Sequence, residues 1–257
     1  MSDSNGHEQV LALLRTRRGE FGPRLLDIPS GGGPVVAGAR AAGYDVVELD
    51  LFPRPAMRGV CADACAALPF RESAFDVVLS MEGIEHFEHQ AGFVRECARV
   101  LAPGGWLVMT TPNVLTLGAR ATHLLTGGKV LKQGFVNEVA TLRGRSGRRL
   151  YHGHAFLIDA FRLRYLVRIA GLEWKSLAGT TLSPTSLCLS PLLPALHLAT
   201  ALATRGARRR LQRAGRPCPD AALERELGRL ARAPALLFRK KLIVLAQKPL
   251  AATAPPV

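Results

Sequence analysis

Residues 24–50 read RLLDIPSGGGPVVAGARAAGYDVVELD, and this stretch combines the local signals of strand, turn and helix. Residues 24–28, three of which are apolar, predict a buried strand, and residues 45–49 predict a second one. Between them a glycine-rich turn leads to Pro34, a residue suited to the first turn of a helix, and Gly43 ends that helix. A strand, turn, helix and strand in this order predict a parallel sheet covered by helices.

The same alternation continues on both sides of this stretch. The expected strands are 60–62, 75–80, 106–111, 172–178 and 241–246, the expected helices are 7–18, 93–101 and 159–171, and 103–105 is expected as a turn. This order predicts an α/β fold whose sheet is mostly parallel, with helices on both faces. Ligands of such sheets bind beyond the carboxyl ends of the strands, which directs attention to the turn at 29–33 and to Asp50.

The glycine-rich turn does not fit a nicotinamide dinucleotide. The G-x-G-x-x-G pattern of those folds would need a third glycine where Val36 stands. An acidic residue, Asp27, also stands inside the strand before the turn, which those folds do not require. The sequence therefore favours another ligand at Gly31 and Gly33, whose missing Cβ atoms allow close approach to the backbone.

Five segments in order resemble the class I S-adenosylmethionine-dependent methyltransferases of the small-molecule type, similar to the ubiquinone-pathway O-methyltransferases. They are LLDIPSGGG (25–33), DVVELD (45–50), ADACAALPF (62–70), FDVVLSMEGIEH (75–86) and ARVLAPGGWLVMTTPN (98–113), with a weaker sixth at HAFLIDAFRLRYLVRIAGLE (154–173). The resemblance implies a Rossmann-like sheet of seven strands, the last antiparallel, and S-adenosylmethionine as cofactor. Pro29 departs from the family, because it stands where the first glycine of the turn is usual.

The resemblance also implies which residues bind the cofactor. Asp50 would accept the ribose hydroxyls in charge-assisted hydrogen bonds, and Asp63 would contact the adenine edge. The full expected set is Asp27, Ser30, Gly31, Gly33, Asp50, Leu51, Asp63, Ala64 and Ser80.

Methyl transfer to an oxygen acceptor requires a group that removes the hydroxyl proton. His86, after the fourth strand, and His154, before the later helix, are the candidates. A role in helix capping or packing is the alternative for each histidine. A carbanion or amine acceptor would need no base.

Glu82, Glu85 and His86 would share one face if this segment were helical, a spacing that could hold a divalent cation. They resemble the E-x-x-E-H of the ubiquinone-pathway enzymes, where a metal is implied. An E-H pair at this point also occurs in relatives that use no metal. We therefore expect no metal here.

Charge is distributed unevenly along the 257 residues. Residues 1–113 hold 10 Arg and 14 acidic residues, a net charge of −4, whereas residues 114–257 carry +18. Seven basic residues stand against Glu138 in the first basic segment: Arg120, Lys129, Lys132, Arg143, Arg145, Arg148 and Arg149. They indicate an acidic or phosphorylated acceptor or, alternatively, a solvated loop. Because Arg outnumbers Lys 28 to 6, coding bias also contributes to the excess.

Residues 183–204 contain no charged residue, and six arginines follow them: Arg205, Arg208, Arg209, Arg210, Arg213 and Arg216. Prolines at positions 184, 191 and 194 argue against a membrane span. The remaining interpretations are an apolar lid over the acceptor site, and a surface at 183–216 that contacts an anionic membrane or admits a lipid-like acceptor.

Together these observations predict one methyltransferase domain at 1–248 with insertions at about 114–150 and 183–236, and a disordered tail at 249–257. The expected activity is methyl transfer from S-adenosylmethionine to a small-molecule acceptor, preferably on oxygen. An RNA methyltransferase is the alternative enzyme, but T-P-N at 111–113 differs from the N/D-P-P-[YF] signature of base-amino methylases, so no nucleic acid is expected as partner. A cofactor-binding scaffold without catalysis is the other alternative. Five scattered cysteines and a polar start without a signal peptide indicate a bacterial cytoplasmic protein.

Overall fold

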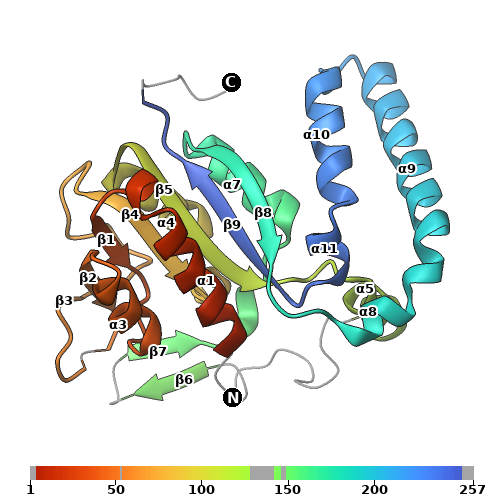
Figure 1. Ribbon diagram of the computed structural model, residues 1–257. Helices are drawn as coiled ribbons and strands as arrows, with labels where there is room; N and C mark the ends of the chain where they lie inside the picture. The colour runs from red at the N-terminus through yellow and green to blue at the C-terminus, as the bar shows by residue number, and fades with distance from the viewer. Residues whose placement is uncertain (1–3, 53, 128–141, 146–148, 251–257) are drawn as a thin grey trace.

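The computed structural model describes residues 4–52, 54–127, 142–145 and 149–250. Its centre is a seven-stranded sheet in the order β3-β2-β1-β4-β5-β9-β8 (Figure 1). The strands are β1 (Arg24–Asp27), β2 (Asp45–Asp50), β3 (Gly59–Cys61), β4 (Phe75–Met81), β5 (Leu101–Pro112), β8 (Glu173–Gly179) and β9 (Lys241–Gln247). Strands β1 to β5 pair in parallel, whereas β9 pairs antiparallel with both β5 and β8. The predicted α/β fold with an antiparallel last strand is confirmed.

Helices cover both faces of this sheet (Figure 1). They are α1 (Ser4–Thr16), α2 (Arg18–Phe21), α3 (Pro34–Ala41), α4 (Gln90–Val100), α5 (Leu117–Thr126), α7 (Ala160–Ile169), α8 (Pro184–Cys188), α9 (Leu193–Arg213), α10 (Ala221–Ala231) and α11 (Pro234–Phe238). Short 3-10 turns are η1 (Ile84–His86), η2 (His154–Phe156) and η3 (Ser190–Leu192). Asp159 caps α7 as predicted, because its carboxylate accepts the backbone N–H groups of Phe161 and Arg162.

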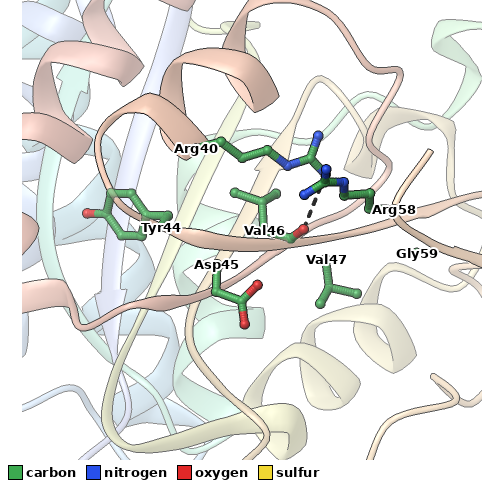
Figure 2. Close-up of a pocket in the computed structure, with 7 residues that line it drawn as sticks. All are labelled: Arg40, Tyr44, Asp45, Val46, Val47, Arg58 and Gly59. Atoms are coloured by element: carbon green, nitrogen blue, oxygen red, sulfur yellow. Dashed lines mark hydrogen bonds between the residues drawn. The ribbon is translucent and has the colours of Figure 1, made fainter. Parts of the chain in front are cut away.

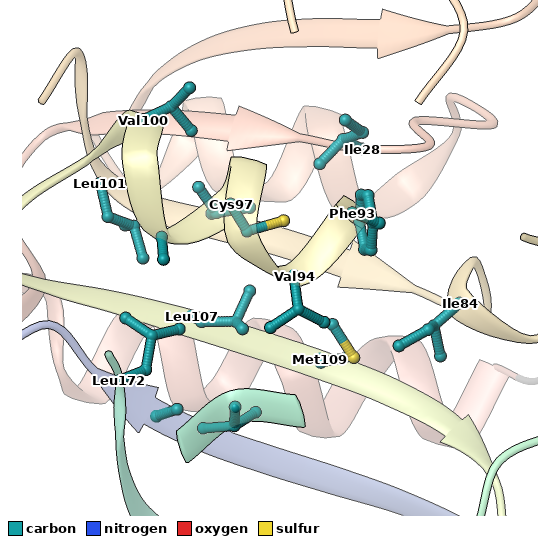
Figure 3. Packing of buried hydrophobic residues seen from close by; sticks show 14 of the residues in the cluster. Ile28, Ile84, Phe93, Val94, Cys97, Val100, Leu101, Leu107, Met109 and Leu172 are labelled. Atoms are coloured by element: carbon teal, nitrogen blue, oxygen red, sulfur yellow. The ribbon is translucent and has the colours of Figure 1, made fainter. Parts of the chain in front are cut away.

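Successive residues of each strand point to opposite faces, so the sheet has two apolar cores. Leu25 of β1 packs in the core under α1, α2 and α3, and the neighbouring Leu26 packs in the core under α4 and α7. Figure 3 shows the second core, where Phe93 and Cys97 of α4 meet Leu107 and other buried side chains of the sheet. Because the sheet is packed on both faces, its strands are held in place, and so are the strand ends that carry the site.

Strand β5 begins earlier than predicted. Phe75 of β4 lies opposite Leu101, but Val77 lies opposite Trp106, so the expected turn at 103–105 is an irregularity within β5 rather than the start of it. Gly104 has φ +79°, which a glycine adopts without strain.

The first insertion is described only in part. It contains α5 and a two-stranded antiparallel sheet of β6 (Leu142–Arg145) and β7 (Arg149–His152). Lys129, Lys132, Glu138 and Arg148 lie outside the described residues, as does the predicted tail from residue 251 onward.

The second insertion begins at the end of β8 and ends at the start of β9, and these two strands pair with each other. Residue Gly179 at the end of β8 lies opposite Leu242 at the start of β9, and α8 to α11 occupy the chain between them. Helices α9 and α10 project to one side of the sheet (Figure 1). Within the described ranges, no helix combines the length and the apolar character that crossing a membrane would need.

Asn113 connects the sheet to this insertion. Its buried side chain donates to the carbonyl oxygens of Leu236 and Arg239, each at 2.8 Å, and accepts the backbone N–H of Leu115 at 2.9 Å. Residue Asn113 thereby holds the end of α11 against the carboxyl end of β5.

We expect Asn113→Ala to lower the free energy of unfolding by about 2–3 kcal/mol, because it leaves buried carbonyl groups without donors. Urea unfolding followed by circular dichroism measures the change. The exposed Gln212 of α9 provides the control, since Gln212→Ala should stay within about 0.5 kcal/mol of the wild type. Equal values for the two variants would contradict the assigned role of Asn113.

Candidate active site

The glycine-rich turn joins the buried end of β1 to the first turn of α3. Gly31, Gly32 and Gly33 all have positive φ angles, of +53°, +74° and +95°. A side chain at these positions would strain the backbone. No atom lies within 4 Å of the place where a Cβ of Gly31 or Gly33 would stand, so the turn is open on that side. The backbone is thus accessible to a ligand.

Pro29 fits the turn despite its departure from the family pattern. Its ring packs against Gly83, at which a Cβ would come within 2.3 Å of the Pro29 Cδ atom. A glycine at 83, in the turn after β4, therefore makes room for the proline ring. The later glycines of the turn keep their open conformation.

Two acidic residues of β2 hold the turn in place. The Asp50 carboxylate accepts the backbone N–H of Gly31 at 2.8 Å and that of Phe52 at 2.9 Å. The buried Glu48 carboxylate accepts the Ser30 hydroxyl at 2.9 Å and pairs with Arg40 and Arg54. Burial by itself would raise the pKa of Glu48, but these hydrogen bonds outweigh it and lower the pKa below its ordinary value.

A cavity of about 1110 Å³ lies over the turn and the ends of β1, β2 and β4. Eight of the predicted site residues line it: Asp27, Ser30, Gly31, Asp50, Leu51, Asp63, Ala64 and His86. Gly33, Ser80 and His154 are not among its lining residues. Ser80 is fully buried close to Gly83, and Gly33 is the residue before α3.

The cavity is also lined by residues that no sequence motif predicted. His7 of α1 lines it, and so do Phe52 and Arg54, which follow β2. The Arg54 guanidinium lies over Gly32, where a Cβ would meet its Nη1 atom. Only the three-dimensional packing of α1 against α3 brings His7 near the turn, so the sequence carried no signal for it.

Asp27 lies at the floor of the cavity, nearly completely buried. Burial raises its pKa to about 8, against an ordinary value of 3.8, and the neighbouring charge of Glu48 adds to the shift. The neighbouring Ser30 hydroxyl acts in the opposite direction. Without a bound cation, this carboxyl group is therefore protonated at neutral pH.

The raised pKa of Asp27 predicts how stability depends on pH. The folded protein holds this proton up to about pH 8 and the unfolded chain only up to about pH 4. The stabilisation that protonated Asp27 provides is therefore complete below pH 4 and lost as pH rises toward 8, by up to about 1.4 kcal/mol per pH unit. Asn cannot titrate, so Asp27→Asn should gain stability relative to the wild type from pH 5 to pH 8. Urea unfolding of both proteins across this range measures the difference, and a constant difference would contradict the assignment.

His86 and His154, predicted separately, lie together at the edge of the site. Their ring centroids are 5.0 Å apart, although the two residues come from the distant segments η1 and η2. Glu85 completes the group: one ligand atom from each of the three residues lies within 4.8 Å of the others. Glu85 is fully buried; its Oε2 atom accepts the Thr111 hydroxyl at 3.1 Å, while its Oε1 atom has no hydrogen-bond partner among the described residues.

The expected grouping of Glu82, Glu85 and His86 on one helical face is corrected by the structure. Glu82 has φ +50° and precedes η1, so these residues do not form a helical turn. Its carboxylate instead pairs with Lys241 of β9 at 2.8 Å. The negative charge of Glu82, together with burial, raises the pKa of Glu85 to about 8, with burial the larger cause. The Glu85 carboxyl group and the two imidazoles therefore lie close enough together to hold a cation or to take up a proton of the acceptor.

A second pocket, of about 580 Å³, lies at the edge of the sheet around β2 and β3 (Figure 2). Arg40 donates there to the carbonyl oxygen of Val46 at 3.3 Å. The lining residues are Arg40, Tyr44, Asp45, Val46, Val47, Arg58 and Gly59, a set without any of the predicted site residues. The candidate active site is therefore the larger cavity.

Comparisons with known proteins identify the family to which the chain belongs. A family model described as a methyltransferase domain matches residues 26–109, which run from β1 to β5. The ubiquinone biosynthesis O-methyltransferase of Burkholderia thailandensis is 30% identical over 176 residues, which are 63% of this chain and 70% of that protein. A probable S-adenosylmethionine-dependent methyltransferase of Mycobacterium tuberculosis is 51% identical over 51 residues, covering 20% of this chain and 19% of that protein.

A solved structure supports the same fold. The Burkholderia thailandensis 1,6-didemethyltoxoflavin-N1-methyltransferase, with bound 1,6-didemethyltoxoflavin and S-adenosylhomocysteine, superimposes with a TM-score of 0.50 at 15% identity, covering 96% of this chain and 80% of that one. At this identity the match concerns the fold alone. Taken with the sequence matches, the sheet order and the open glycine turn, it leads to one conclusion: the chain belongs to the class I S-adenosylmethionine-dependent methyltransferases and is an enzyme with S-adenosylmethionine as its cofactor.

Proposed function

We propose that this enzyme transfers the methyl group to a hydroxyl oxygen of a small-molecule acceptor, and that the pair His86 and His154 takes up the hydroxyl proton. The observation that carries the proposal is the contact between the two imidazole rings beside the cavity that Asp27, Gly31 and Asp50 line. The name of the Burkholderia relative, an O-methyltransferase, agrees with an oxygen acceptor. The proposal takes residues 1–248 as one methyltransferase domain with insertions at 114–150 and 183–236.

The cavity fits the cofactor in shape and in chemistry. Its open backbone at Gly31 leaves room for the amino-acid end, and Asp27 beside it would bind the positive charge there. Asp50 ends β2 at the position where a carboxylate would accept the ribose hydroxyls, with Leu51 next to it. Asp63 and Ala64 line the part of the cavity beyond β3 and would border the adenine. When bound, S-adenosylmethionine supplies an electrophilic methyl group on a sulfonium.

The residues of this chain would then position the acceptor and take up its hydroxyl proton. Placing the acceptor oxygen about 3–3.5 Å from the methyl carbon in line with its bond can supply roughly 7–11 kcal/mol of the barrier reduction. His86 lines the cavity and is the nearer candidate for the base, while His154 packs on its ring. The buried Glu85 carboxyl lies within 4.8 Å of both imidazoles and would orient them.

The cavity and the charge of the chain indicate the class of acceptor. The cavity is of a size that suits a cofactor with a small second ligand, which favours a small molecule over a polymer. The net charge of +18 in residues 114–257 favours an acceptor that carries negative charge. A small molecule that carries both a hydroxyl and an acidic group combines these properties.

Methyl transfer with purified enzyme tests the proposal. Catechol, which offers hydroxyl groups, and aniline, which offers only an amine, serve as probes in a coupled assay of S-adenosylhomocysteine release. Methylation of catechol but not aniline, with a rate that survives EDTA, supports a hydroxyl acceptor and a histidine base. Preference for aniline would contradict the oxygen assignment, and loss of activity in EDTA that Mg²⁺ restores would assign Glu85, His86 and His154 to a cation instead.

A further inference from the structure

Exposed leucines are found on α5, α8 and α9 and on η3, which joins the last two. Leu187 of α8, Leu192 of η3, and Leu198 and Leu202 of α9 are each exposed by 46% or more, and Leu198 reaches 62%. Leu124 and Leu125 of α5 are more exposed still. Helix α5 adjoins α8 through a hydrogen bond from the Gly118 N–H to the Ser186 hydroxyl at 3.0 Å. A concentration of large apolar side chains on one part of a surface marks a contact site.

Four exposed side chains of α9 form one stripe along the helix. Residues 198, 202, 205 and 209 follow each other at intervals of four, three and four, so they lie within about 60° of one another around the helix axis. Leu198 and Leu202 form the first half of the stripe, and Arg205 and Arg209 form the second. The half-buried residues Leu196 and Leu211 lie on the other side of the helix. The stripe therefore faces solvent.

The positive charge of the basic half of α9 is balanced by few acidic side chains. The helix contains Arg205, Arg208, Arg209, Arg210 and Arg213 and no acidic residue. Arg208 pairs with Glu224 of α10 at 2.9 Å. Within the described part of the chain, no ion pair is seen for the other four arginines, which are all exposed. Such a helix end attracts an extended negative surface.

We propose that α9 rests on an anionic lipid surface, with Leu198 and Leu202 entering the outer acyl region and Arg205 and Arg209 at the phosphate headgroups. An anionic bilayer accommodates both halves of the stripe, because it offers apolar depth below a negative layer. A nucleic acid would leave the leucines without a partner, and a second copy of α9 would place arginines near arginines. Helix α9 lies along the surface rather than across it, since it lacks the apolar length for a span. The proposal does not depend on the identity of the methyl acceptor.

Flotation of the full chain with vesicles tests this inference. Binding to phosphatidylcholine vesicles containing 25% phosphatidylglycerol is expected, with at least tenfold weaker binding to phosphatidylcholine alone. The double substitution Arg205→Gln and Arg209→Gln should weaken binding to the anionic vesicles about tenfold or more. The reason is that each arginine near an anionic surface adds to the affinity for it. Arg225→Gln with Arg229→Gln on α10 removes the same charge from exposed positions and should change binding less than twofold.

A second measurement distinguishes insertion from simple charge attraction. Leu198→Trp should show a blue-shifted emission on anionic vesicles beyond the signal of the native Trp106 and Trp174, and Leu198→Ser with Leu202→Ser should weaken binding. Absence of vesicle binding by the wild type at low salt overturns the proposal. It is also overturned if the α10 variant loses as much affinity as the α9 variant. Binding of poly-uridylate that equals vesicle binding and ignores the leucine substitutions would assign α9 to polyanions instead.

Discussion

Replacement of His86 by alanine is expected to lower kcat for a hydroxyl acceptor by about 10²–10⁴-fold, the usual contribution of a general base. The His86 ring lies on the cavity wall, and its loss removes the group that we propose as the base. The affinity for S-adenosylmethionine should change little, because the turn residues and Asp50 remain in place. Steady-state kinetics and calorimetry of the cofactor measure the two quantities separately.

A double variant shows whether the two histidines act together. If His154 supports the His86 ring across their 5.0 Å contact, removing both should cost little more than removing His86 alone. The exposed His123 of α5 provides the control, since His123→Ala should leave kcat unchanged. Losses that simply multiply would show that the two histidines contribute independently. A His154→Ala variant with normal kcat would show that His154 has no part in the reaction.

Asp50→Ala is expected to weaken cofactor binding about 100-fold or more. The substitution removes the carboxylate that we propose as the partner of the ribose diol, and hydrogen bonds to a charged group contribute about 1.5–3 kcal/mol each. It also frees the Gly31 N–H, which the carboxylate holds at 2.8 Å, so the open turn loses its support. Isothermal titration calorimetry measures the affinity.

Two matched variants locate the effect at the carboxylate. Asp45→Ala removes an exposed acidic residue at the other end of the same strand and should leave affinity unchanged. Asp50→Asn keeps one oxygen acceptor and should lie between the wild type and the alanine variant. Wild-type affinity in Asp50→Ala would remove Asp50 from the cofactor site.

The parts of the fold that follow from local signals were predictable. The strand at residues 24–27, the glycine turn and the helix from Pro34 depend on periodicity, glycine freedom and a proline at a helix start, which neighbouring residues determine. The matching family segments extended this to a mostly parallel sheet of seven strands with an antiparallel last strand. The family's spacing also directed attention to His86 and His154 one at a time.

Contacts between distant segments could not be predicted in the same way. Nothing in the sequence places the His154 ring on His86, or His7 beside the glycine turn, because these neighbours result from the packing of helices. The prediction for Glu82 failed for a local reason: the chain after β4 adopts a positive φ at this residue, and Lys241 from the last strand then attracts its carboxylate. The direction of α9 relative to the sheet depends on similar long-range contacts.

The attachment of the second insertion has a consequence for protein engineering. Because Gly179 and Leu242 face each other on adjacent strands, the chain between them starts and finishes at almost the same place. We expect that such a segment can be exchanged for one from a related enzyme without altering the register of the sheet. The new segment must offer carbonyl groups to Asn113, a carboxylate to Arg164 and an acceptor to the Gly118 N–H. Chimeras joined at these two residues would keep the cofactor half of the molecule and acquire a different surface for whatever the α8 to α11 segment contacts.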